Sequence, residues 1–257
     1  MPKPCDPVLL RARINSCLER KRLRDRQKVV AEQLRIEKEK SEVLLLNVLP
    51  KPIVTRLQRG ESLIADRIPD ATILFADLVG FTRLSLRLPP TSLVGLLNLL
   101  FTDFDRLAVK FGLEKIKTIG DAYMVAGGLL EHRLDHLAAA ADMALAMLDS
   151  VRQASGRFGE PLQIRVGLHA GPVIAGVIGT HKFIYDIWGD TVNIASRLES
   201  HGVPDAINAS AEIRRRLQDA FDFAPAIVID LKGMGPTEVH LLQARRGAIS
   251  GGISPMV

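Results

Sequence analysis

The first 49 residues contain no glycine and, after Pro7, no proline, and this lack of helix breakers constrains the fold more than any other feature. Glycine and proline are the residues that a helix interior tolerates least. Pro50 and Pro52 then interrupt the pattern, and Gly60 follows. The sequence therefore predicts one long helix that leads into a separately folded region.

Within this helix, eight positions recur at alternating spacings of four and three residues, which is the pattern of a heptad seam. They are Leu23, Gln27, Val30, Leu34, Glu37, Ser41, Leu44 and Val48. Because one helix cannot bury this mainly apolar stripe on itself, we expect a parallel coiled coil between two chains. An amphipathic helix packed on its own domain is the alternative. The polar seam positions would weaken the pairing, which suits a helix that transmits a signal.

The positive charge of the chain lies in the same segment. The net charge is +5, and residues 1–42 hold 12 Lys or Arg against 7 Asp or Glu, while the rest is balanced. A basic run at residues 20–28 precedes the better heptads, and a basic region before a zipper is a DNA-binding layout. Glu19, Asp25 and Glu32 interleave with this run and favour a solvated helix surface. We therefore predict no nucleic-acid partner, and keep DNA binding as the alternative from a different class.

The remaining bulk features fit an ordinary intracellular protein. No apolar run approaches the roughly 20 residues that a membrane helix needs. The N-terminus has no apolar stretch of the kind found in a secretory signal. Cys5 and Cys17 have no partner at metal-ligand spacing, so we expect two free thiols in a reducing compartment. Together these features predict a cytoplasmic chain without a membrane span.

From about residue 70 strands, turns and helices alternate, and this pattern by itself predicts an α/β region. The apolar run 71–76 suits a central strand that ends on Asp77. Residues 91–111 predict a helix, because two prolines precede the helical spacing and Gly112 follows it. Further strands are predicted at 114–118, 123–126, 226–230 and 238–242, and further helices at 134–151 and 191–199. Strands 163–169 and 173–178 are predicted to form a hairpin, with Gly171, Gly176 and Gly179 as turn glycines.

Two aspartates at the ends of predicted strands carry the first chemical signal. Asp77 ends a buried strand shortly before Gly80, and Asp121 follows Gly120 in a turn. Mg²⁺ binds few protein carboxylates and completes its shell with phosphate oxygens or water. On adjacent strands the pair could share two ions, one lowering the pKa of an attacking hydroxyl and one stabilising a leaving pyrophosphate. Taken singly, each is more simply a turn aspartate.

Three longer stretches resolve this ambiguity. They are residues 75–82 (FADLVGFT), 115–124 (KIKTIGDAYM) and 185–197 (YDIWGDTVNIASR). In sequence, order and separation they closely resemble the three signature stretches of the class III nucleotidyl cyclases. The resemblance spans about residues 44–242. It implies an α+β fold, with a ferredoxin-like βαββαβ cyclase core, an antiparallel sheet and surrounding helices, preceded by the long coiled-coil helix.

The resemblance also implies roles for individual residues. Asp77 and Asp121 match the family's two metal-binding aspartates, and the backbone carbonyl of Leu78 matches a further metal contact. The implied cofactors are two divalent cations, Mg²⁺ or Mn²⁺. Lys117 and Asp186 match the pair that reads adenine, since a lysine donates to ring N1 and a carboxylate accepts from the 6-amino group. Guanylate members carry Glu and Cys-type residues there, so ATP is the implied substrate and GTP the alternative.

The remaining matches concern the transition state and the triphosphate. Asn193 and Arg197 match the family's transition-state pair, and their i, i+4 spacing places them on one helix face. Asn193 would orient the ribose, and Arg197 would neutralise charge developing on the phosphate. Lys232 resembles the triphosphate-binding lysine, although Met234 stands where the family often has a second lysine. The implied enzyme is an adenylate cyclase that forms 3′,5′-cyclic AMP and pyrophosphate.

In this family the metal aspartates and the base-reading residues of one site come from different chains, which implies a homodimer with two equivalent sites. The expected organisation is a helical dimerisation segment at 1–49, a transducer-like linker at 50–69, the catalytic domain at 70–244 and a disordered tail at 245–257. Residues 3–13 resemble the end of a response-regulator receiver domain. An upstream receiver or sensor domain is therefore a further expected partner.

Overall fold

A computed structural model describes residues 7–130, 134–179 and 182–247. The chain divides into two compact units, residues 1–61 and 62–257. Most of the predicted disordered tail (248–257) and the first part of the receiver-like stretch (residues up to 6) lie outside the described residues. Nothing in the described residues therefore tests those two expectations.

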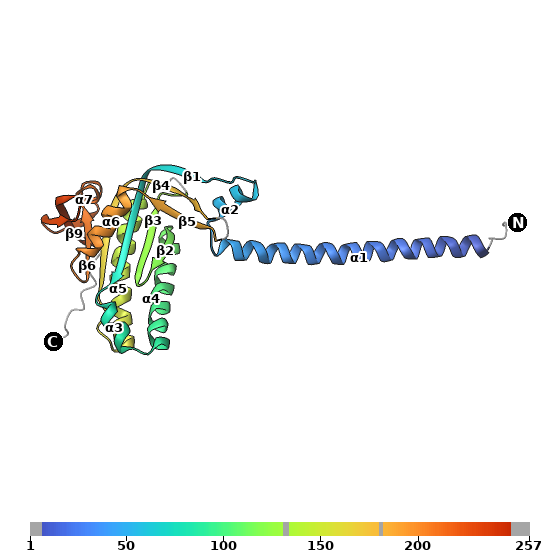
Figure 1. The fold of residues 1–257 in the computed structure, drawn as a ribbon, viewed down its shortest axis with the longest axis horizontal. Coiled ribbons are helices and arrows are strands. Elements are labelled where there is room, and N and C mark those ends of the chain that lie inside the picture. Colours follow the sequence, from blue (N-terminus) through green and yellow to red (C-terminus); the bar gives the residue numbers. More distant parts are fainter. Residues whose placement is uncertain (1–6, 131–133, 180–181, 248–257) are drawn as a thin grey trace. The chain divides into compact units, whose positions relative to one another are not determined.

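The first unit consists of helices α1 (Pro7–Leu46) and α2 (Lys51–Gln58) (Figure 1). The long helix predicted from the absence of breakers is confirmed, and Pro52 lies in the first turn of α2, where its missing N–H costs nothing. No side chain of α1 is buried. Leu23, Val30 and Leu34 of the heptad seam are 57 %, 56 % and 69 % exposed. The pairing of this seam with a second chain stays a prediction.

The second unit contains the remaining elements. Its strands are β1 (Ala65–Leu78), β2 (Glu114–Ile119), β3 (Ala122–Gly127), β4 (Ile164–Ile178), β5 (Ile184–Trp188), β6 (Ala206–Ser210), β7 (Phe221–Phe223), β8 (Ile227–Leu231) and β9 (Gly235–Arg245). Its helices are α3 (Phe81–Arg87), α4 (Pro90–Phe111), α5 (His136–Phe158), α6 (Asp190–Ser200) and α7 (Ala211–Leu217). Among the described residues, no helix is both long and apolar enough to cross a membrane.

The strands form one mostly antiparallel sheet in the order β2-β3-β1-β4-β6-β9-β7, with β5 paired to β4 and β8 paired to β9. Helix α4 connects β1 to β2 and α5 connects β3 to β4, so the first four strands make a βαββαβ unit with the ferredoxin-like strand order. The predicted fold class is thereby confirmed. The exception to antiparallel pairing is β4 with β6, which run parallel.

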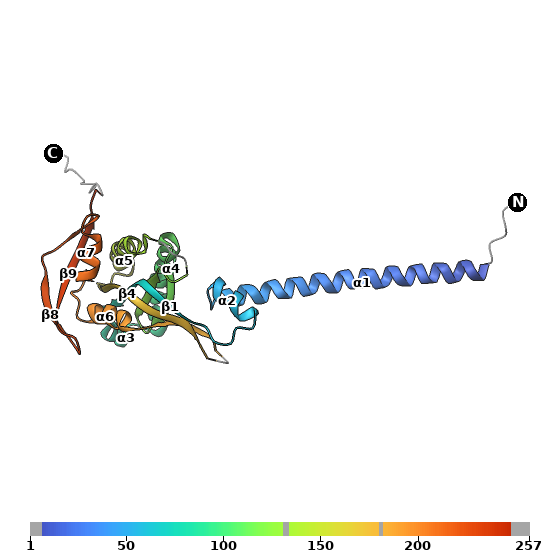
Figure 2. The same ribbon diagram turned by 90° about the horizontal axis from the view of Figure 1, so that it is seen from above.

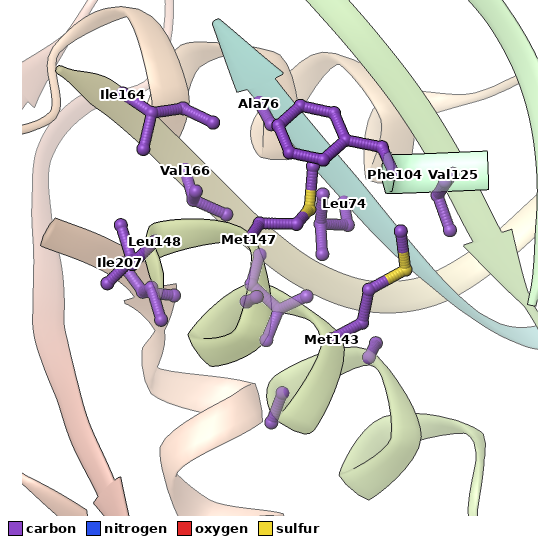
Figure 3. Close-up of a cluster of buried hydrophobic side chains, with 14 of the residues drawn as sticks. Leu74, Ala76, Phe104, Val125, Met143, Met147, Leu148, Ile164, Val166 and Ile207 are labelled. Atoms are coloured by element: carbon purple, nitrogen blue, oxygen red, sulfur yellow. The ribbon is translucent and has the colours of Figure 1, made fainter. Parts of the chain in front are cut away.

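Helices cover both faces of the sheet (Figure 2). Helices α4, α5 and α7 lie on one face and α6 lies on the other. The main core forms between β1, β4 and the α4–α5 pair, where Leu74, Phe104, Met143 and Met147 are at most 2 % exposed (Figure 3). This packed layer fixes where β1 ends, and therefore where Asp77 is presented.

The sequence signals for helix ends were mostly reliable. Helix α4 ends at Gly112, which adopts φ +65° and donates its N–H back to the last turn. Helix α5 is longer than the predicted 134–151 and ends at Gly159, with φ +67°. In contrast, α3, β5, β6, α7 and β7 were not predicted, because each is short and carries too few residues to show a period.

The predicted hairpin at residues 163–178 is wrong. Residues 164–178 form a single strand, β4, that passes straight through Gly171. A Cβ atom at Gly171 would lie 2.8 Å from Oγ1 of Thr191, and one at Gly176 would lie 2.4 Å from the carbonyl oxygen of Ile64. These two glycines therefore permit close packing rather than a turn. Only Gly179, with φ +102°, stands at a chain reversal, just after the end of β4.

Helix α6 sits directly on β4 at Gly167. A Cβ atom at this position would lie 2.3 Å from both the carbonyl oxygen of Ala195 and the amide nitrogen of Glu199. At the other end of α6, Thr191 Oγ1 donates a 2.6 Å hydrogen bond to the carbonyl of Pro172. These two attachments determine where α6 presents its side chains.

Substituting Gly167 by alanine is expected to lower the free energy of unfolding by about 1–3 kcal/mol, as overpacking typically does. The added methyl group would meet helix backbone that has no rotamer to adjust. Gly95→Ala is the matched control, because Gly95 lies in α4, where an added Cβ would have no neighbouring atom within 4 Å. The free energy of unfolding of this variant should rise by about 0.5–1 kcal/mol. Urea denaturation of both variants measures the difference. Equal stability of the two variants would contradict the close packing of α6 on β4 at Gly167.

Candidate active site

Asp77 and Asp121 lie side by side at one end of the sheet. Asp77 is the penultimate residue of β1, and Asp121 follows Gly120 (φ +64°) in the turn between β2 and β3. The register that pairs Ala76 with Tyr123 brings this turn next to the end of β1. Burial, followed by the nearby charge of Asp77, raises the pKa of Asp121 to about 6. The two carboxylates thus repel each other in a partly buried position.

This repulsion is what a divalent cation would relieve, and the pair fits one. Two carboxylates with room for phosphate or water oxygens suit Mg²⁺ or Mn²⁺ better than a closed protein cage. Within the described residues, no group of three or more His, Cys, Asp or Glu side chains is placed to hold an ion. Leu78, whose carbonyl the sequence predicted as a further contact, ends β1 directly after Asp77, with its side chain in the core.

Arg165 completes this region and was not predicted from the sequence. It lies directly opposite Asp77 in the pairing of β4 with β1, and its Nη2 donates a 2.9 Å hydrogen bond to Oδ2 of Asp77. Its Nε lies 3.2 Å from Oε1 of Glu199 on α6. Burial and then the charge of Asp77 raise the pKa of Glu199. The only sequence signal was a charged residue inside the apolar run of a predicted strand.

Lys117 and Asp186, predicted as the base-reading pair, are in contact. Nζ of Lys117 on β2 lies 2.5 Å from Oδ2 of Asp186 on β5, across 69 positions of sequence. The side chain of Lys117 is 35 % exposed and that of Asp186 is 14 % exposed. The other oxygen of Asp186 accepts the N–H of Ile187 at 2.9 Å. A cationic donor and a carboxylate acceptor are therefore held next to each other, partly shielded from water.

Asn193 and Arg197 line one pocket, as their i, i+4 spacing on α6 predicted. The pocket has a volume of about 320 Å³ and is also lined by Asp190, Ile194, Gly233 and Met234. Gly233 adopts φ +77° in the turn between β8 and β9, and a Cβ atom there would lie 3.7 Å from the Arg197 guanidinium. Lys232 precedes it in the same turn and is exposed.

The predicted residues therefore form three groups in one chain. They are the carboxylates Asp77 and Asp121 with Arg165, the pair Lys117 and Asp186, and the α6 pocket with Asn193, Arg197 and neighbouring Lys232. Across the described part of the chain, no hydrogen bond or ion pair joins one group to another. His169 lies outside these groups: it is half-buried on β4, and its Nδ1 lies 2.8 Å from Ser210 Oγ.

A family model for the adenylate and guanylate cyclase catalytic domain matches residues 63–244, which is most of the chain. The chain belongs to this family. The chain is 43 % identical over 217 residues to an adenylate cyclase of Mycobacterium tuberculosis, covering 84 % of this chain and 49 % of the relative. It is 40 % identical over 230 residues to guanylate cyclase soluble subunit beta-2 of Rattus norvegicus, covering 88 % of this chain and 33 % of the relative. The chain thus spans half or less of the length of these two relatives.

Solved structures agree on the fold of the cyclase domain. The adenylyl cyclase CyaB from P. aeruginosa superposes with a TM-score of 0.68 at 30 % identity, covering 71 % of this chain and 97 % of that chain. The guanylate cyclase domain of RhGC from Catenaria anguillulae, solved in complex with GTP, superposes with a TM-score of 0.67 at 33 % identity. This match covers 70 % of this chain and 100 % of that chain. Similarity is therefore nearly equal to adenylate and guanylate cyclases, and the nucleotide preference depends on the residues of the site.

Proposed function

We propose that this cyclase is an adenylate cyclase, which converts ATP to 3′,5′-cyclic AMP and pyrophosphate. The observation that carries this proposal is the Lys117–Asp186 contact. Adenine presents an acceptor at N1 and a donor at its 6-amino group, which match an ammonium donor and a carboxylate acceptor. Guanine presents a donor at N1 and an acceptor at O6, the reverse pattern. A guanine at this pair would leave buried polar groups mismatched, which is costly.

The other residues account for the reaction. The 3′-oxygen of ribose forms a bond to the α-phosphorus while the bond from that phosphorus to the pyrophosphate oxygen breaks. The hydroxyl proton leaves to water or to Asp77. Asn193 orients the ribose, Arg197 neutralises charge that develops on the α-phosphate, and Lys232 binds the triphosphate. Two divalent cations held by Asp77, the carbonyl of Leu78 and Asp121 would supply activation of the hydroxyl and stabilise the leaving group.

The proposal includes a homodimer in which each site draws on both chains. Asp77 and Asp121 of one chain would face Lys117, Asp186, Asn193 and Arg197 of the other. The separation of these residues into groups without direct bonds supports this arrangement. The exposed heptad seam of α1 supplies an apolar stripe that a second α1 would cover. A coiled coil of this kind would set how the two catalytic units meet.

Incubating the purified chain with ATP and GTP in parallel, with Mg²⁺ or Mn²⁺, tests the proposed activity. Cyclic AMP is expected as the main product, with a kcat/KM for ATP well above that for GTP. Preferential formation of cyclic GMP would support the second candidate, a guanylate cyclase, which the 40 % identity to a guanylate cyclase subunit keeps open. A salt-dependent shift of DNA without turnover would instead support the DNA-binding hypothesis for the basic run at 20–28.

A further inference from the structure

The carboxylate of Asp105 on α4 binds both strands of the β2–β3 hairpin. Oη of Tyr123 on β3 donates a 2.5 Å hydrogen bond to Oδ1 of Asp105. Nζ of Lys115 on β2 donates a 2.9 Å hydrogen bond to Oδ2 and lies 2.7 Å from Oδ1. The same Nζ lies 5.1 Å from the centre of the Tyr123 ring, whose face attracts a cation. These three residues take no direct part in the proposed reaction, but the hairpin that they hold carries Lys117 and Asp121.

Strand β2 contains a β-bulge that decides the direction of Lys117. Lys115 pairs with Val125 of β3 and Lys117 pairs with the adjacent Met124, so Ile116 is the extra residue. Directly opposed residues of two paired strands point to the same face of a sheet. Val125 belongs to the core beneath α4 and α5, so Lys115 points toward these helices, and Met124 points to the other face. The bulge therefore turns Lys117 away from α4, whereas in a regular strand it would share the face of Lys115.

Asp105 holds one residue on each side of this bulge. Lys115 precedes the extra residue, and Tyr123 pairs with the residue that follows Lys117. Strand β2 is at the edge of the sheet (Figure 1), and among the strands of the described residues only β3 pairs with it. A one-residue slip of such a strand would turn its side chains to the opposite face. Because a slip would also take Lys115 away from Asp105, the contacts of Asp105 oppose it.

We infer that Asp105 is a positioning residue for base recognition, because it holds the bulge that places Lys117 against Asp186. In the register that Asp105 holds, Nζ of Lys117 lies 2.5 Å from Oδ2 of Asp186. The inference rests on the proposed base-reading role of this pair. It adds a second requirement for nucleotide preference: the two residues must be present, and the register of β2 must be held from the helix face of the sheet.

Asp105→Ala is expected to weaken the preference for ATP, because the register of β2 is then held less firmly and Lys117 meets adenine less often. The ratio of kcat/KM for ATP to kcat/KM for GTP should fall about tenfold, as for the loss of one charge-assisted hydrogen bond. The KM for ATP should account for most of this change. Competition between ATP and GTP, with both cyclic products quantified, measures the ratio. A loss of stability alone would lower both activities together and leave the ratio unchanged.

Two further variants make this test decisive. Asp103→Ala is the matched control, because Asp103 lies on the same helix and accepts a 2.9 Å hydrogen bond from Arg106 of that helix, so the ratio should stay at its wild-type value. Asp105→Ala leaves the hydroxyl of the buried Tyr123 without its acceptor, which lowers stability. Lys115→Met avoids this cost, since the Lys115 side chain is 38 % exposed, and it should lower the ratio about threefold or more. An unchanged ratio in Lys115→Met or in folded Asp105→Ala would overturn the inference, and a wild type that prefers ATP would leave the proposed function intact.

A double-mutant cycle tests whether Asp105 acts through Lys117. In a Lys117→Met background there is no lysine to position, so Asp105→Ala should change the ratio by less than about twofold. An equal fall in both backgrounds would mean that Asp105 affects base recognition by another route, and would overturn the inference.

Amide hydrogen exchange provides a readout that needs no nucleotide. In Asp105→Ala, the amides of residues 114–119 should exchange about tenfold faster than in the wild type, because the bulge is held less firmly. The Asp103→Ala chain should exchange there as the wild type does. Wild-type exchange of β2 in Asp105→Ala would contradict the inference. A wild type that prefers GTP would instead contradict the proposed function, and this measurement would still show whether Asp105 holds the bulge.

Discussion

Asp77→Ala and Asp121→Ala are each expected to abolish cyclase turnover without unfolding the chain. Each removes half of the carboxylate pair that holds the proposed cations, whose stabilisation of transition-state charge is worth several kcal/mol. We therefore expect kcat/KM for ATP to fall by a factor on the order of 10³ or more. Initial rates of cyclic AMP formation at saturating Mg²⁺ or Mn²⁺ measure the effect.

The stability of the Asp121 variant provides an internal check. Burial and the charge of Asp77 raise the pKa of Asp121, so its ionised form destabilises the native state at neutral pH. Asp121→Asn should therefore melt at a temperature at least as high as the wild type while remaining inactive. Asp149→Asn, at an exposed position of α5, should keep both activity and melting temperature. Full activity in purified Asp77→Ala or Asp121→Ala would refute the metal assignment.

The double substitution Lys117→Glu with Asp186→Cys, at the proposed base-reading pair, is expected to shift the nucleotide preference toward GTP. The introduced glutamate would accept from guanine N1–H, and the carboxylate that matches the adenine amino group would be gone. Two hydrogen bonds at about 1–3 kcal/mol each correspond to a change of about 10²-fold or more in the ratio of the two kcat/KM values. Competition between ATP and GTP, with both cyclic products quantified, measures this ratio.

A matched control removes the effect of charge alone. Lys110→Glu with Asp149→Cys makes the same residue changes at exposed positions of α4 and α5. That chain should keep the wild-type ATP/GTP ratio. If the Lys117/Asp186 double variant also keeps it, these two residues do not read the base. A general loss of activity on both nucleotides with an unchanged ratio would count against base reading in the same way.

Sequence patterns predicted the parts of the site that lie within continuous stretches. The apolar run ending at Asp77, the Gly120-Asp121 turn and the i, i+4 pair Asn193 and Arg197 all depend on local spacing. The resemblance to known signature stretches then assigned them roles. The long helix α1 and the helix α4 were predicted for the same local reasons, from absent or well-placed glycines and prolines.

What could not be predicted depends on contacts between distant strands. The bond from Arg165 to Asp77 exists because β4 pairs with β1 in one register, and no local pattern encodes that register. Gly171 looked like a turn residue because glycine permits both turns and close packing, and only the position of Thr191 decides between them. The close packing of α6 on β4 at Gly167 could not be predicted for the same reason.

The central claim is that this chain is an adenylate cyclase whose site is completed by a second copy. Mixing two inactive chains tests this claim most directly. Asp77→Ala chains lack the metal group and Arg197→Ala chains lack the transition-state arginine, so each homodimer is expected to be inactive. Random pairing makes about half of the dimers mixed, and each mixed dimer has one intact site out of two. An equal mixture should therefore recover about a quarter of wild-type cyclic AMP formation; no recovery in confirmed mixed dimers would contradict the shared site.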